Sequence, residues 1–194
     1  MLRVPSAAAP CQRRTPRIWR AGACSPQDIA FFRRAAQGFA DERDRPMIIQ
    51  RDTPHDPAAA ALLRQSHALM QSLFPEEANH FLSLDALAAP GIVFLTARDG
   101  DAVLGTGAMA DHGTYGEVKS IFTAAEARGR GVAQAILERI EQEARAKGLP
   151  VLRLETGTGL DAAHRLYRRA GFEPRGPFGD YEAGPYSLFF EKRL

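Results

Sequence analysis

The amino-acid sequence predicts an α/β fold in which one mixed β-sheet carries helices on its faces. Two observations lead to this prediction: short apolar runs alternate with longer amphipathic stretches, and a tight hairpin turn joins two of the runs. The 194 residues are 45% hydrophobic and 25% charged, as is usual for globular proteins, which excludes a fibrous or wholly disordered chain.

The first 46 residues differ in composition from the rest of the chain. They contain nine arginines and four acidic residues, whereas residues 47–194 contain 16 basic and 19 acidic ones and are mildly acidic. We expect residues 1–46 to be a largely disordered Arg/Ala/Pro-rich leader, with a short peripheral helix after the capping signal at residues 25–28. A transit peptide is another interpretation of this leader. Residues 47–194 are expected to form one domain, and Met47 is an alternative start.

The first elements of the domain are expected to be a strand and two helices. Residues 47–51 predict a short strand. A long helix is expected over residues 57–74, because its apolar side chains recur at helical spacing, and Pro75 ends the pattern. Residues 79–88 predict a second, short helix.

Three strands are expected next. Residues 92–97 are an apolar run, and the Asp99-Gly100 pair predicts a hairpin into a second strand over residues 102–109. A third strand, over residues 116–123, follows a glycine-containing turn.

The last third of the domain alternates helices and strands. Residues 130–147 and 161–170 predict helices, each followed by a glycine. Strands are expected over residues 150–155, 172–174 and 187–192. The complete order is therefore β-α-α-β-β-β-α-β-α-β-β.

Two glycine motifs compete as nucleotide-binding sites. Residues 105–110 match the dinucleotide fingerprint G-x-G-x-x-A, but another strand follows instead of the helix that the fingerprint requires. We therefore interpret these glycines as packing positions in a strand. Residues 128–133, Arg-Gly-Arg-Gly-Val-Ala, lead into a long helix. Backbone amides at a helix N-terminus, with two arginines beside them, can hold a diphosphate.

Two motifs of the sequence resemble those of a known family. Arg128-x-x-Gly131-x-Ala133 resembles the Q/R-x-x-G-x-G/A signature of the GNAT superfamily of acyl-CoA N-acyltransferases. Residues 163–172 are similar to its A-x-x-L-Y-x-x-x-G-F ending. The resemblance is close over residues 117–172 and covers residues 47–194 in outline. It implies a GNAT-like sheet whose fourth and fifth strands splay apart.

The resemblance also implies acetyl-CoA as co-substrate, with its pantetheine arm between the splayed strands. The residues expected to contact it are Ile121, Phe122, Thr123, Arg128, Gly129, Arg130, Gly131, Val132, Ala133 and Thr156. Leu160 departs from the family, in which many members carry a cofactor-contacting asparagine at this position. Thr156 is one residue that could compensate.

Two residues are expected to be catalytic. Tyr167 stands at the position of the family's general acid, and a phenol is protonated at neutral pH and can donate to a leaving thiolate. Glu117 stands 11 residues before Arg128, where some members place the base that deprotonates the amine. His112 and Glu155 are further candidates for the base.

The expected reaction is N-acetylation of a primary amine by direct attack in a ternary complex, because residues 47–194 contain no cysteine that could carry the acetyl group. The acceptor is a small molecule or a peptide, and its identity stays open. The residues expected to surround it are Phe74, His80, Phe178 and Tyr181.

The sequence also leaves other functions open. The alternatives are a non-catalytic acyl-CoA-binding regulatory module and, less favoured, an oxidoreductase using residues 105–110. The five histidines lack metal-ligand spacing, so no metal is expected. The charge distribution and the lack of a long apolar run predict no nucleic-acid or membrane partner. We expect a cytoplasmic protein, and a homodimer is compatible with the sequence.

Overall fold

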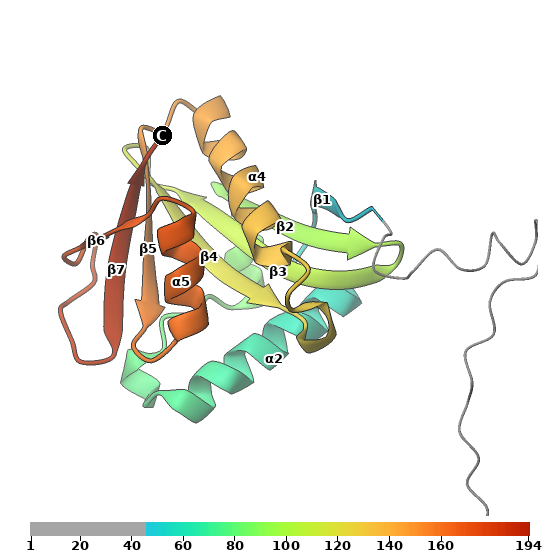
Figure 1. Ribbon diagram of the computed structural model, residues 1–194, viewed down its shortest axis with the longest axis horizontal. Helices are drawn as coiled ribbons and strands as arrows, with labels where there is room; N and C mark the ends of the chain where they lie inside the picture. Colours follow the sequence, from blue (N-terminus) through green and yellow to red (C-terminus); the bar gives the residue numbers. More distant parts are fainter. Residues whose placement is uncertain (1–45) are drawn as a thin grey trace, which may run out of the picture. The chain divides into compact units, whose positions relative to one another are not determined.

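The computed structural model describes residues 46–194, so the expected leader and its short helix lie outside the described residues. The strands form one mixed sheet in the order β1-β2-β3-β4-β5-β7-β6 (Figure 1). They are β1 (Ile48–Arg51), β2 (Ile92–Asp99), β3 (Ala102–Asp111), β4 (Gly116–Thr123), β5 (Val151–Gly157), β6 (Glu173–Arg175) and β7 (Ser187–Arg193). The helices are α2 (Pro57–Leu73), α3 (Leu84–Leu87), α4 (Val132–Ala146) and α5 (Asp161–Arg169). The predicted α/β class and order of elements are confirmed.

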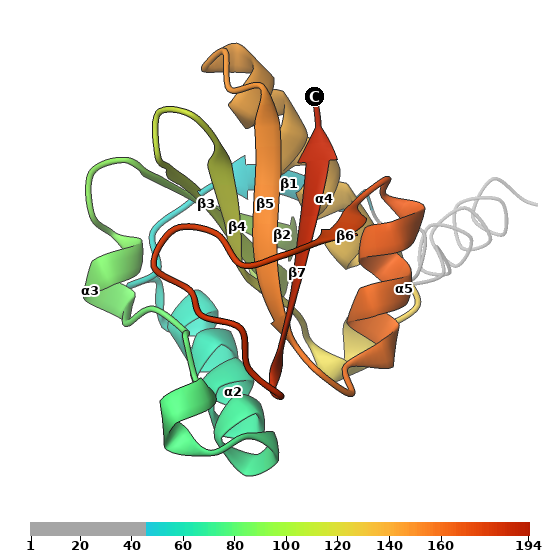
Figure 2. The same cartoon turned by 90° about the vertical axis from the view of Figure 1, so that its left-hand side faces the viewer.

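The helices cover both faces of the sheet. Helices α4 and α5 lie on one side, and α2 and α3 lie on the other (Figures 1 and 2). Helix α4 packs closely on β3 because the strand has glycines beneath it. A Cβ at Gly107 would lie 2.4 Å from Ile136 Cγ2, and one at Gly105 would lie 2.6 Å from Val132 Cγ1. These two glycines are packing positions in a strand, as the sequence predicted.

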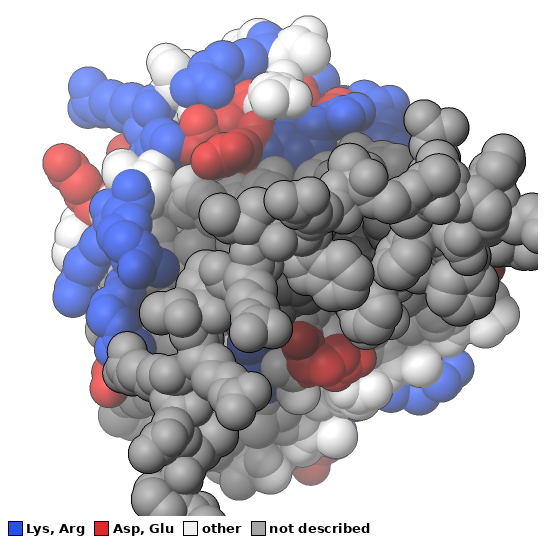
Figure 3. All heavy atoms as spheres, turned by 45° about the vertical axis from the view of Figure 1, so that its right-hand side comes forward, with Lys and Arg blue, Asp and Glu red and all other residues white. Residues whose placement is uncertain are grey.

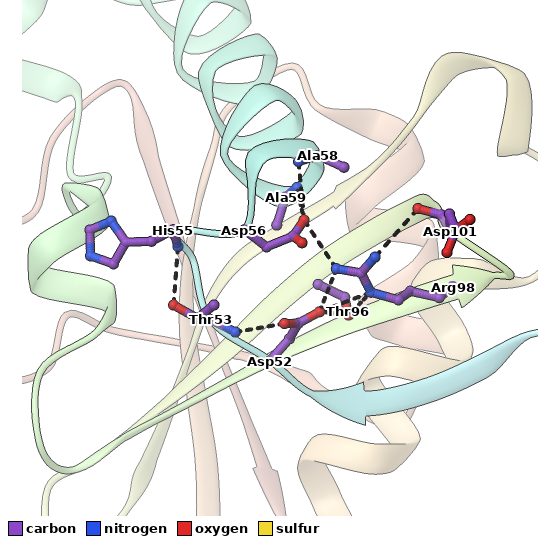
Figure 4. Close-up of polar contacts among 9 residues, drawn as sticks. All are labelled: Asp52, Thr53, His55, Asp56, Ala58, Ala59, Thr96, Arg98 and Asp101. Atoms are coloured by element: carbon purple, nitrogen blue, oxygen red, sulfur yellow. Dashed lines mark hydrogen bonds and ion pairs between the residues drawn. The ribbon is translucent and has the colours of Figure 1, made fainter.

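A polar cluster fixes the start of α2 (Figure 4). Pro57 is the first residue of the helix, and the side chain of Asp56 accepts hydrogen bonds from the next two backbone amides, each at 3.0 Å. Arg98 of β2 reaches Asp56 at 3.0 Å and Asp52 at 2.7 Å. This arginine therefore ties the loop after β1 to both the helix and the sheet.

Strands β4 and β5 are the only parallel neighbours in the described sheet, and they separate soon after they meet. Their pairing is limited to Gly116 with Leu152 and Glu117 with Arg153. Beyond these pairs β5 continues along β7, while β4 continues along β3. The splay implied by the resemblance is therefore present, and it leaves a gap in the middle of the sheet.

The predicted helix over residues 79–88 is wrong in extent. Only Leu84–Leu87 is α-helical, and a 3₁₀ turn, η2 (Glu76–Ala78), precedes it. The side chain of Asn79 donates to the backbone oxygens of Phe74 and Pro75 and so competes with helix formation. Ser83 then caps the helical turn by accepting from the amide of Ala86.

The start of α4 also lies two residues later than predicted. Gly129 and Gly131 adopt positive φ angles of 80° and 77°, so the helix begins at Val132, after a second 3₁₀ turn, η3 (Ala125–Ala127). Such angles are left-handed and favour glycine. The two glycines therefore shape the loop in front of the helix and are not part of it.

Candidate active site

The edge of β4 that faces the gap is shaped by an irregularity in the strand. Ser120 has a φ of 54° and is the only described residue other than glycine with a positive φ. The pairing of β3 with β4 shifts register at the same place, between Thr106 and Ala108, and the Thr106 hydroxyl donates to the Ser120 oxygen at 3.0 Å. Ile121–Thr123 therefore follow a bulge and are unpaired with β5. Their outer edge can accept an extended ligand as an added strand.

The predicted diphosphate cradle lies at the N-terminus of α4. No side chain caps this helix end, so its first amides are free to bind an anion. A Cβ at Gly129 or Gly131 would meet no atom within 4 Å, so the space in front of the amides is open. Arg128 is exposed beside it, whereas Arg130 contacts Asp99 at 3.4 Å. Residues 128–133 therefore form an open helix start, and their binding of a diphosphate stays a prediction.

A pocket of about 160 Å³ occupies the gap between β4 and β5, and we call it the gap pocket. Ile121 lines it from β4, Glu155 and Thr156 from β5, and Tyr167 from α5. Tyr167 is 7% exposed, and burial together with the nearby Glu155 carboxylate raises the pKa of its phenol. The phenol therefore stays protonated at neutral pH, as a general acid must.

A second pocket of about 900 Å³ opens on the α2 side of the sheet, and we call it the outer pocket. It shares His80 and Lys119 with the gap pocket, and Glu117 and Tyr181 line it as well. Along β4, Glu117 and Lys119 alternate with Val118, which belongs to the core under α4. The two charged side chains consequently face the opposite side, toward α2.

Glu117 is held by three side chains. Its Oε1 accepts from the Tyr181 hydroxyl at 2.7 Å and from Lys119 Nζ at 3.0 Å, and its Oε2 lies 3.1 Å from His112 Nε2. Lys119 also donates to Tyr181 at 2.6 Å and to the backbone oxygen of His80 at 3.3 Å. Burial and the neighbouring Glu117 raise the pKa of the Tyr181 phenol. Both oxygens of Glu117 are therefore occupied.

The four residues expected around the acceptor lie in different places. Phe74 lines the gap pocket, where a Cβ at Gly157 would lie 2.3 Å from its Cζ atom. His80 lines both pockets, and Tyr181 lines the outer pocket. Phe178 lines neither of these two pockets and instead supports Tyr181, with the two ring centroids 5.1 Å apart. Thr156 and Leu160 both line the gap pocket, on the side of α5.

Sequence reasoning missed several polar residues of the site. Lys119 could have been found, because it follows Glu117 at the two-residue period of a strand and so shares its face. His67 and Asn79 gave no signal, yet both line the gap pocket. Each has a buried polar atom without a partner, His67 Nε2 and Asn79 Oδ1. The described residues contain no cluster of three metal-ligating side chains and no helix long and apolar enough to cross a membrane.

The surface carries charges of both signs. The face drawn in Figure 3 shows basic and acidic side chains next to one another. On α4, for example, Arg139 pairs with Glu143 at 2.8 Å and Arg145 pairs with Glu141 at 3.3 Å. The arginines of these pairs are partly exposed, whereas Glu141 and Glu143 are buried and also pair with Lys192 and Arg51.

Comparisons with known proteins identify the class to which this fold and site belong. The family model of the acetyltransferase (GNAT) family matches residues 57–172. The chain is 47% identical over 150 residues to an IAA acetyltransferase of Azospirillum brasilense, covering 76% of this chain and 98% of the relative.

Solved structures agree with this result. A proposed acyl-CoA N-acyltransferase of Klebsiella pneumoniae superposes with a TM-score of 0.65 at 28% identity, covering 78% of this chain and 99% of the other. A GNAT acetyltransferase of Elizabethkingia anophelis with acetyl-CoA bound has the same fold, with a TM-score of 0.57 at 18% identity and coverage of 78% and 99%.

The chain belongs to the acetyltransferase (GNAT) family. It is an acyltransferase enzyme, and acetyl-CoA is its co-substrate. The alternative of a non-catalytic acyl-CoA-binding module is not favoured, because the matching relatives are acetyltransferases.

Proposed function

We propose that this enzyme transfers the acetyl group of acetyl-CoA to a primary amine by direct attack in a ternary complex. The observation that carries this proposal is that the gap pocket joins the two sides of the sheet. Tyr167 reaches it from α5, and Lys119 and His80 belong both to it and to the outer pocket. A thioester on one side and an amine on the other can therefore meet in the gap.

The donor is proposed to bind on the side of α4 and α5. Residues 128–133 would hold the pyrophosphate through the free amides of α4, with Arg128 supplying charge. Ile121, Phe122 and Thr123 would pair with the pantetheine arm through their unpaired backbone edge, and Thr156 would contact it from β5. These contacts bring the thioester toward Tyr167.

Tyr167 is proposed as the general acid. As the nitrogen attacks the carbonyl carbon, the carbon–sulfur bond breaks and the phenol gives its proton to the leaving thiolate. Its burial supports this role, because a buried phenol keeps its proton until a stronger base forms beside it.

Replacing Tyr167 with phenylalanine tests this assignment. We expect kcat to fall roughly 10²-fold or more, because a positioned acid contributes about that much, while acetyl-CoA affinity measured by calorimetry stays unchanged. Ser72→Ala is the control, since it also removes a hydroxyl, but from an exposed residue of α2 that lines neither pocket. Unchanged turnover in Tyr167→Phe would remove this residue from the mechanism.

The acceptor is proposed to enter through the outer pocket, past His80 and Tyr181, toward Phe74 in the gap pocket, while Phe178 supports Tyr181. A small amine and a peptide N-terminus are both compatible with a pocket of about 900 Å³. IAA, the compound in the name of the Azospirillum relative, should be among the acceptors that are tested. Glu117 and Glu155 are both candidates for the base that deprotonates this amine.

We also propose the extent of the catalytic unit, its location in the cell and its oligomeric state. Residues 47–194 are the catalytic unit, which agrees with the family match over residues 57–172. A cytoplasmic location is consistent with the lack of cysteine in these residues. A homodimer could form through the sheet edges at β1 and β6.

A further inference from the structure

The acceptor side of the gap carries two carboxylates, Glu117 on β4 and Glu155 on β5. Arg153 is the last residue of β5 that pairs with β4, and its partner is Glu117. Glu155 follows Arg153 by two positions and therefore points to the same face as Glu117. Both candidates are thus within the region where the amine would lose its proton. Their surroundings, however, differ.

Both oxygens of Glu117 are already engaged by other side chains. Tyr181 and Lys119 hold Oε1, and His112 holds Oε2. Protonating this carboxylate would break its ion pair with Lys119, whose side chain is only 13% exposed, and would leave an ammonium with one partner fewer. Glu117 also lines the outer pocket and not the gap pocket.

Glu155 has one side-chain partner. Ser187 of β7 donates to its Oε1 at 2.7 Å, and no hydrogen bond engages its Oε2 among the described residues. Glu155 lines the gap pocket together with Tyr167, whose phenol is close enough to feel its charge. Its free oxygen is therefore available in the pocket that also contains the proposed acid.

The burial of Glu155 makes it a stronger base than an exposed carboxylate. Desolvation raises the pKa of this carboxyl, whereas the Ser187 hydroxyl and the charges of His80 and Lys119 lower it, and Glu117 raises it again. The groups that face Glu155 are therefore Glu117 and Lys119 from β4, His80 from the segment before α3, Tyr167 from α5 and Ser187 from β7.

We propose that Glu155 is the general base of the reaction and that Glu117 holds Lys119 and Tyr181 in place at the entrance to the gap. This inference rests on the proposed transfer to an amine. The acceptor's ammonium gives a proton to Glu155, and the free amine attacks the thioester carbon. The new carbon–nitrogen bond forms as the carbon–sulfur bond breaks, and Tyr167 protonates the thiolate. The second proton lost by the nitrogen restores Tyr167, and Glu155 releases its proton to water, so one proton is released per turnover.

The test compares the pH dependence of kcat/KM in the full-length wild type, Glu155→Gln and Glu117→Gln, with the best amine of a panel. We expect Glu155→Gln to lower kcat by roughly 10²-fold or more and to remove the acidic limb of the profile. Glu117→Gln should change KM more than kcat and should keep the limb. Thermal melting and acetyl-CoA binding confirm that each variant is folded.

Ser187→Ala gives a second readout that does not remove either carboxylate. Losing the Ser187 hydrogen bond takes away a contact that lowers the pKa of Glu155, so the acidic limb should move to higher pH. This variant keeps the test decisive even where Glu155→Gln fails to fold.

Three results would contradict the assignment of Glu155 as the base and leave the proposed acetyl transfer standing. They are an active Glu155→Gln variant that keeps the acidic limb, an acidic limb that disappears in Glu117→Gln, and an acidic limb that does not move in Ser187→Ala. A wild type that acetylates no amine in the panel would overturn the proposed function itself, and this inference with it.

Discussion

At the scale of single residues, the titratable groups of the site differ in how many hydrogen-bond partners they have. Tyr167 is buried in the gap pocket, and Glu155 keeps one oxygen free there, whereas Glu117 is fixed by three neighbours. The family resemblance indicated Tyr167 through the motif over residues 163–172, and Glu117 through its position 11 residues before Arg128. It could not show that Lys119, Tyr181 and His112 surround Glu117, because two of these contacts depend on loops that fold back over the sheet.

The positive φ of Ser120 is another residue-scale feature without a sequence signal. A serine in a strand pattern predicts ordinary extended backbone. Only the packing of β3 against β4, where the Thr106 hydroxyl bonds to Ser120, makes the bulge visible. The bulge matters for function because it separates the part of β4 that pairs with β5 from the part whose edge faces the gap.

Arg98 carries a prediction about stability. Burial opposes the ionised form of Asp52, but hydrogen bonds from Thr96 and Arg98 outweigh it and lower the pKa of this carboxyl. Replacing Arg98 with methionine should therefore cost about 2 kcal/mol of unfolding free energy at pH 7. Urea titrations measure the loss.

The same interaction sets the pH dependence of that loss. A carboxyl with a lowered folded pKa stabilises the fold above its unfolded pKa of about 3.9, and its contribution disappears as the pH falls through the folded value. The difference in unfolding free energy between the wild type and Arg98→Met should therefore become smaller below about pH 4. A difference that stays constant down to pH 2 would contradict this role of Arg98.

At the scale of elements, α4 is the part of the site that the sequence predicts best. Its apolar residues at a spacing of four and its flanking glycines defined the helix to within two residues at its start. The short helix before β2 was predicted poorly. Its extent depends on which backbone groups Asn79 and Ser83 bind, and a periodicity of apolar residues does not report such bonds.

The two glycines that flank α4 provide a matched test of the cradle. Gly131 at the N-terminus and Gly148 at the C-terminus both have positive φ angles, of 77° and 72°, and both have open space where a Cβ would lie. Replacing either with alanine should cost about 1–2 kcal/mol of stability, because a left-handed conformation is strained for any residue with a Cβ.

Only Gly131→Ala should also weaken binding of acetyl-CoA, since its backbone belongs to the proposed pyrophosphate site. Calorimetric titration of both variants with CoA measures the difference. Equal affinities in the two variants would show that the N-terminus of α4 does not hold the cofactor.

At the scale of the whole molecule, the separation of β4 and β5 gives the sheet its function. Two pairs of residues join the strands at one end, and beyond them the gap pocket connects the α4 side with the α2 side. The α/β class, the order of elements and the splay could all be predicted, because they follow from alternating patterns and from two motifs in the right order. The shape of the outer pocket could not, because it is built by the loops before α3 and before β7.

In the proposed reaction, donor and acceptor approach the gap from opposite faces of one sheet. A crystal structure of the full-length chain with CoA bound would show whether the donor does so. We expect the pyrophosphate on the amides of residues 129–133, the pantetheine arm between β4 and β5, and the sulfur in the gap pocket beside Tyr167 and Glu155. CoA bound in the outer pocket, or with its sulfur away from the gap, would contradict this expectation.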